Sequence, residues 1–142
     1  MTRLSWRGTR LISKWQVRRL TPDAERGSPE DAYNLAITLE RLGRDAEAEH
    51  WYRQATELGD TDATCNLGLL LARTGREIEA LTHLAVAADR GDAEAAYNAG
   101  AVCEDIHDQI GAHGWYTRAA ELGDRDAVVW VQRAHGKRGA AS

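Results

Sequence analysis

Four glycines recur along the chain at a constant interval of 32 residues, and the residues around them recur as well. They are Gly27, Gly59, Gly91 and Gly123. A fixed period of about 20–50 residues is typical of a stacked repeat array, in which each unit buries its apolar face against its neighbours. The period therefore predicts a repeat architecture, and it argues against an enzyme.

Each repeat divides into two amphipathic segments with apolar residues at helical spacing. In the first segment, Ala32, Leu35, Ala36 and Leu39 share one face. A glycine at the end of a helix tolerates the left-handed backbone that stops it, and an aspartate directly after it can cap the next helix. A Gly-Asp pair therefore marks the end of one helix and the start of the next. The predicted helices span residues 29–42, 45–58, 61–73, 76–90, 93–105, 109–122 and 125–135.

The third repeat departs from this pattern. His107 stands where the first two repeats have a glycine in the turn between their helices. Gly111 and Gly114 then fall inside the predicted helix 109–122, and each costs about 0.5–1 kcal/mol relative to alanine. This helix is therefore expected to be the least stable of the array.

Charge divides the chain into a basic N-terminal arm and an acidic body. Residues 1–22 contain no acid, whereas the rest of the chain has 12 basic residues against all 22 acids. The arm is predicted as a helix over residues 4–20 that ends at Thr21-Pro22. The predicted organisation is the arm at 1–22, the array at 27–136 and a disordered tail at 137–142. The basic residues of the arm are Arg3, Arg7, Arg10, Lys14, Arg18 and Arg19.

Several classes of function lack support in the sequence. No Ser-His-acid set, glycine-rich phosphate loop or Cys-x-x-Cys is present, and the carboxylates and histidines of residues 104–113 straddle a turn. No catalytic residue, cofactor or metal site is therefore expected. The two cysteines form no paired framework, and no apolar run approaches the length of a membrane span. A cytoplasmic location is expected.

Two sequence motifs resemble the Sel-one-like repeat, a branch of the tetratricopeptide superfamily. One is Ala-x-x-x-Leu-Gly in a first helix (Ala63 to Gly68), and the other is Trp-Tyr-x-x-Ala-Ala-x-x-Gly in a second helix (Trp115 to Gly123). The resemblance covers residues 27–131 and implies an adaptor that assembles protein complexes. The expected fold is an all-α, right-handed helical-hairpin solenoid of three 32-residue repeats, with a C-terminal capping helix and an N-terminal basic helix.

In arrays of this kind the first helix of each repeat lines a concave groove. An asparagine recurs there in every repeat, on the face opposite the apolar stripe, and its amide can both donate to and accept from a peptide backbone. Two arginines beside the row could bind acidic side chains. A bracing role between helices is the alternative for the asparagines. The predicted groove residues are Asn34, Thr38, Arg41, Asn66, Leu70, Arg73, Asn98 and Val102.

The sequence thus predicts a non-catalytic adaptor that binds a peptide or a partner helix in the concave groove, and an acidic peptide is one candidate partner. The alternative is a nucleic-acid-associated regulator whose basic arm contacts phosphates. The arm could instead pair with an acidic protein surface or an anionic membrane surface, or cover the first repeat. The oligomeric state is left open by the sequence.

Overall fold

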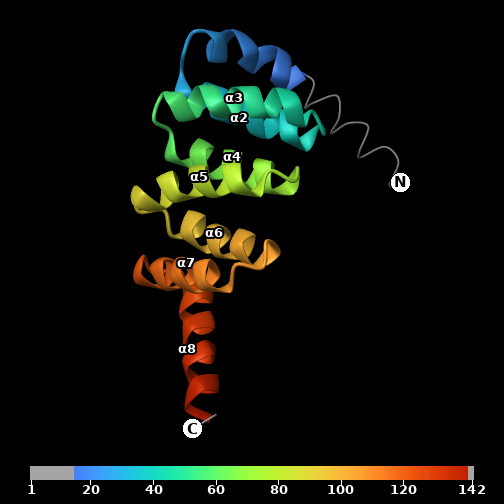
Figure 1. Ribbon diagram of the computed structural model, residues 1–142. Coiled ribbons are helices and arrows are strands. Elements are labelled where there is room, and N and C mark those ends of the chain that lie inside the picture. Colours follow the sequence, from blue (N-terminus) through green and yellow to red (C-terminus); the bar gives the residue numbers. More distant parts are fainter. Residues whose placement is uncertain (1–14, 141–142) are drawn as a thin grey trace, which may run out of the picture. The chain divides into compact units, whose positions relative to one another are not determined.

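A computed structural model describes residues 15–140 of the chain, and every regular element in this part is a helix. Residues 15–25 are helical, and seven further helices follow: three consecutive pairs joined by short turns, then a single last helix (Figure 1). Their bounds lie within one or two residues of the predicted ones, except at the C-terminus. They are α2 (Pro29–Arg41), α3 (Asp45–Glu57), α4 (Thr61–Arg73), α5 (Glu77–Asp89), α6 (Ala93–Asp105), α7 (Gln109–Glu121) and α8 (Arg125–Ala140).

The chain forms two compact units, Met1–Leu67 and Gly68–Ser142, and each is described by itself. In the first unit, α2 and α3 pack against each other as a hairpin. Its interior is made of small and aliphatic residues around one aromatic ring, because Leu35, Leu39 and Tyr52 are fully buried together with several alanines. Leucine and alanine thus fill the core, as expected for close helix-on-helix packing without phenylalanine.

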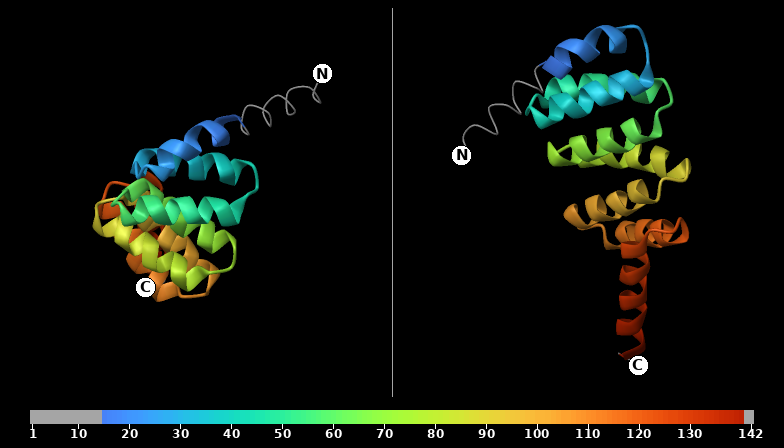
Figure 2. Two further views of the ribbon diagram at one scale, coloured as in Figure 1. Left: turned by 90° about the horizontal axis from the view of Figure 1, so that it is seen from above. Right: turned by 180° about the vertical axis from the view of Figure 1, so that it is seen from behind.

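In the second unit, the sequential helices α5, α6, α7 and α8 each contact the next one. Buried alanines again dominate the contacts, joined by Leu84, Cys103 and Tyr116. The last helix, α8, runs steeply away from α7, so that its second half extends beyond the α6–α7 hairpin (Figures 1 and 2). The neighbourhood of α7 and α8 nevertheless reaches His135, whose ring centroid lies 6.4 Å from that of His113.

The turns confirm the predicted use of glycine and aspartate. Gly59, Gly91 and Gly123 all have positive φ, between 89° and 96°. The aspartate that follows each of them accepts a hydrogen bond from the backbone N–H three residues later, at 2.8–3.1 Å. Each helix start thereby gains a satisfied donor and a negative charge at its positive end.

The first and the last helix each extend further toward the C-terminus than predicted. The first helix continues through Pro22 to residue 25, and its Thr21 hydroxyl donates to the carbonyl of Val17, which lies one turn earlier. Helix α8 continues to Ala140, where a disordered tail from residue 137 was expected. No proline interrupts this end, and Lys137 places a positive charge near the negative end of the helix.

His107 adopts the same left-handed backbone as the turn glycines that it replaces. It is the one non-glycine residue with positive φ, 63°, within the described part of the chain, whereas Gly43 and Gly75 occupy the equivalent turns at 73° and 80°. A residue with a Cβ pays about 1–2 kcal/mol for this conformation.

We expect His107→Gly to stabilise the chain by about 1 kcal/mol, because glycine adopts positive φ without steric cost. Urea denaturation of the intact chain and the variant measures the change. The matched control is His50→Gly, which places the same substitution at an exposed position inside α3. That control should lose stability, and equal losses in both variants would contradict the assignment of strain to His107.

Candidate interaction site

An aromatic cluster joins α6, α7 and α8 in the second unit. The ring centroids of Tyr97 and Tyr116 lie 5.1 Å apart, and those of Tyr116 and Trp130 lie 4.5 Å apart. His113 lies 5.6 Å from Trp130 by the same measure. Aromatic pairs at these separations add to the free energy of packing. The cluster therefore fixes α8 against the α6–α7 hairpin.

Tyr116 is held at both ends of its side chain. Its hydroxyl donates to a carboxylate oxygen of Glu104 at 2.9 Å, and its ring is nearly fully buried. Burial, reinforced by this hydrogen bond and the charge of Glu104, raises the pKa of Tyr116 above its usual range. The neutral hydroxyl thus remains a donor. Tyr52 and Glu40 form the same bond at 2.7 Å in the first unit, 64 residues earlier.

A glycine makes room for the ring of Tyr116. A Cβ built at Gly100 would lie 2.8 Å from two ring carbons of Tyr116, closer than side-chain contacts allow. Gly68 plays the same part opposite Leu84, where the closest approach would be 2.7 Å. The glycine of the Ala-x-x-x-Leu-Gly motif therefore lets the two helices of a repeat approach closely.

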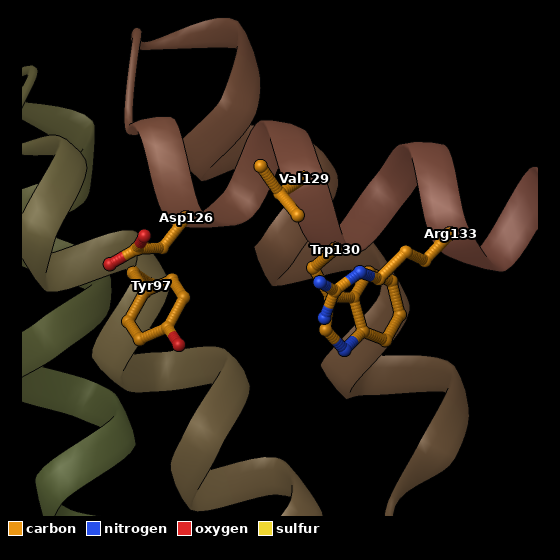
Figure 3. Close-up of a pocket in the computed structure, with 5 residues that line it drawn as sticks. All are labelled: Tyr97, Asp126, Val129, Trp130 and Arg133. Carbon is orange, nitrogen blue, oxygen red and sulfur yellow. The ribbon is translucent and has the colours of Figure 1, made fainter.

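Beside this cluster lies a pocket of about 320 Å³. Helix α6 contributes Tyr97, and α8 contributes the other four lining residues. In Figure 3 the carboxylate of Asp126 lies near Tyr97 at one end, and the Trp130 ring lies with the Arg133 side chain at the other. The lining residues are Tyr97, Asp126, Val129, Trp130 and Arg133.

The pocket combines aromatic and aliphatic lining residues with a charged side chain at each end. Asp126 and Arg133 are exposed, and neither forms an ion pair with another residue of the described part. Trp130 is half-buried, so one part of its ring packs on Tyr116 while the rest lines the pocket. Such a site can take an apolar side chain and orient its polar neighbours.

The structure separates the predicted groove residues into three groups. Asn34, Arg41 and Arg73 are exposed, and Thr38, Asn66 and Asn98 are half-buried. Leu70 and Val102 are buried, with 1% and 4% of their surface exposed, and their place in the groove was wrong. Their aliphatic side chains pack into the core at positions where the first repeat has the polar Thr38. Whether the remaining six form one groove stays a prediction.

Asn66 has a partner inside the first unit. Its side-chain amide donates to the Tyr33 hydroxyl at 3.4 Å. The same side chain acts to lower the pKa of Tyr52, against the larger effect of burial, which raises it. This contact links α4 to α2 and matches the bracing alternative for this one asparagine. Asn34 is exposed and remains available to a ligand.

The period also accounts for the residue that the sequence reasoning missed. Trp130 lies 32 residues after Asn98, in the fourth position of the row that begins with Asn34. Because residues 125–135 were treated as a cap alone, the row was not continued into this helix. Continuing it would have placed a tryptophan on the face predicted to bind a partner.

The basic arm lies largely outside the described residues, which include Arg18 and Arg19 but not Arg3, Arg7, Arg10 or Lys14. Both described arginines are exposed, and the Arg19 guanidinium lies 5.4 Å from the centre of the Trp15 ring. Within residues 15–140, no helix is long and apolar enough to cross a membrane. In the same range, no three His, Cys, Asp or Glu residues gather where they could hold a metal ion.

No protein-family model matches the sequence, and no curated protein matches it. Solved structures do match. YrrB, a tetratricopeptide repeat protein with an unusual peptide-binding site, is 24% identical with a TM-score of 0.70, and the match covers 88% of this chain and 68% of that chain. PcrH in complex with the chaperone binding region of PopD is 17% identical with a TM-score of 0.66, over 77% of this chain and 92% of that one.

A Sel1 repeat protein from Oxalobacter formigenes is 26% identical with a TM-score of 0.62, and the match covers 82% of this chain and 96% of that chain. Together these matches confirm the predicted fold class of helical-hairpin repeats, and they confirm the resemblance to Sel-one-like repeats of the tetratricopeptide superfamily.

Proposed function

We propose that this chain, which has the Sel-one-like repeat fold of the tetratricopeptide superfamily, is a non-catalytic adaptor that binds a peptide or a partner helix at the pocket between α6 and α8. The observation behind the proposal is the position of Trp130. It is a half-buried tryptophan that lines the pocket, in the repeat position predicted to face a partner. Tryptophan is strongly enriched among residues that dominate binding energy at protein interfaces.

The structural neighbours support this class of function. PcrH was solved with the chaperone binding region of PopD, and in another structure with that of PopB. YrrB is described as having a peptide-binding site. A fold that accommodates peptides in such neighbours is a suitable scaffold for an adaptor.

The pocket suggests the kind of peptide. An apolar or aromatic anchor would pack between Tyr97 and Trp130, with charged groups of the peptide near Asp126 and Arg133. The site separates opposite charges by seven residues of α8, a distance of about 10 Å along the helix axis. A peptide with an anchor between a basic and an acidic residue fits this order. The acidic partner, with the exposed Asn34, Arg41 and Arg73 as its contacts, remains a separate prediction from the sequence.

Selection from a displayed library of random linear peptides on the intact chain tests the proposal. Titration calorimetry then compares selected peptides on the intact chain and on Trp130→Ala. We expect Trp130→Ala to weaken binding at least about thirtyfold, the effect of an interface residue worth 2 kcal/mol or more.

The matched control is Trp51→Ala, since Trp51 is half-buried on α3 in the other unit. It should leave the peptide affinity unchanged. Because Trp130→Ala also removes packing, Val129→Asp is measured as well; it changes an exposed pocket residue and should also weaken binding. Failure to enrich any peptide, or equal affinity for all four proteins, would contradict the proposed site.

The nucleic-acid alternative and the cytoplasmic location remain predictions. Binding of duplex DNA or RNA that falls steeply with salt and disappears on deleting residues 1–20 would favour the alternative. Salt-independent or absent binding would remove it.

A further inference from the structure

The exposed face of α8 has an order of side chains that is complementary to itself. Asp126, Val129, Trp130 and Arg133 lie on one face by helical spacing. Asp126 and Arg133 are exposed, and 43% of the surface of Val129 is exposed although it is aliphatic. Along the helix the face reads acid, apolar, aromatic, base.

The four positions are spaced symmetrically about the midpoint between Val129 and Trp130, with opposite charges at the two ends. Asp126 lies three residues before Val129, and Arg133 lies three residues after Trp130. In an antiparallel pair of such helices with a two-fold axis at this midpoint, each Asp126 faces an Arg133 of the other helix. Val129 of each helix then faces Trp130 of the other. A parallel pair would instead oppose like charges, which is unfavourable.

We propose that the partner of this face is a second copy of the chain, whose α8 packs antiparallel against it in a two-fold symmetric dimer. A two-fold interface uses the same patch on both subunits, so the patch must be complementary to itself. The α8 face meets this requirement with two ion pairs and a central apolar contact. This inference goes beyond the proposed function, and its failure would leave the proposed function standing.

The arrangement of the second unit leaves room for this contact. Ala127 of α8 is fully buried, whereas Asp126, Val129 and Arg133 are exposed where they line the pocket beside Tyr97 of α6. Because the same residues line the pocket, the dimer and a bound peptide compete for one surface.

Sedimentation equilibrium of the full chain over a wide concentration range tests the dimer. We expect a monomer–dimer equilibrium for the parent chain. Asp126→Arg and Arg133→Asp should each raise the dimer dissociation constant at least about tenfold, because each sets like charges against each other twice. Arg125→Asp, which makes the same change of charge as Arg133→Asp at a position next to Asp126, is the control and should dimerise like the parent.

Mixing the two variants provides the decisive arm. Asp126→Arg has two arginines where Arg133→Asp has two aspartates, so an equimolar mixture should form a heterodimer although each variant alone is monomeric. The double variant Asp126→Arg/Arg133→Asp should regain the homodimer. If Asp126→Arg proves unfolded by circular dichroism, the comparison of Arg133→Asp with the Arg125→Asp control decides.

A parent chain that stays monomeric at every concentration would overturn the inference, as would a dimer that none of the charge reversals weakens. Either result would leave the peptide-binding assay, which measures Trp130→Ala against selected peptides, unaffected. The two proposals are therefore tested separately.

Discussion

Truncation of the chain after Gly123 should lower the melting temperature by about 10–20 °C, because it removes the helix that covers the aromatic cluster. Trp130 stacks on Tyr116 with ring centroids 4.5 Å apart, and Ala127 of the same helix is fully buried. Loss of a packed tryptophan alone typically costs about 3–5 kcal/mol. A repeat array also needs a terminal element to cover its last apolar face.

The experiment is a thermal melt followed by circular dichroism, with binding of a hydrophobic dye as a second signal. The truncated chain should bind the dye, since Tyr97 and Tyr116 lose their cover. The control is truncation after Gly136, which retains Trp130 and removes only residues beyond its contacts; its melting temperature should change little. An unchanged melt after truncation at Gly123 would show that α8 is no cap.

Most of the helix boundaries could be predicted from sequence, because turn geometry depends on local residues. Positive φ favours glycine so strongly that a glycine followed by aspartate identifies both the end of one helix and the start of the next. His107 could be identified as an exception because the neighbouring repeats supply the expected residue. The C-terminal end of α8 lacked such a signal, and the helix continues through Gly136 and Gly139 to Ala140.

The candidate site could be predicted only in part, because burial depends on contacts between helices. The periodicity placed Leu70 and Val102 in the same row as the polar Thr38, although aliphatic side chains in that row pack inward. Asn66 likewise forms a hydrogen bond to Tyr33 that no local pattern specifies. The pocket forms where α6 and α8 come together in the folded chain, so the sequence alone could not reveal it. The repeat interval by itself leads only to Trp130.

Gly100→Ala should destabilise the chain by about 1–3 kcal/mol, the usual cost of forcing an extra methyl group into a packed core. The sign is not obvious, because alanine is favoured over glycine inside a helix by about 0.5–1 kcal/mol. The new Cβ would lie 2.8 Å from two ring carbons of Tyr116. The ring cannot easily move away, since its hydroxyl is bonded to Glu104 and Trp130 packs on it.

Two other helical glycines supply matched comparisons for this urea denaturation. Gly114 is exposed in α7 with no atom within 4 Å of a built Cβ, so Gly114→Ala should stabilise the chain by about 0.5–1 kcal/mol. Gly68→Ala meets the backbone carbonyl oxygen of Ala80 at 3.2 Å and the side chain of Leu84, which can shift more readily than the ring of Tyr116. It should therefore destabilise the chain, but less than Gly100→Ala. The expected order of stability is therefore Gly114→Ala, parent, Gly68→Ala, Gly100→Ala. If Gly100→Ala were as stable as Gly114→Ala, the close approach of α6 and α7 would not require glycine, and the motif residue would need another explanation.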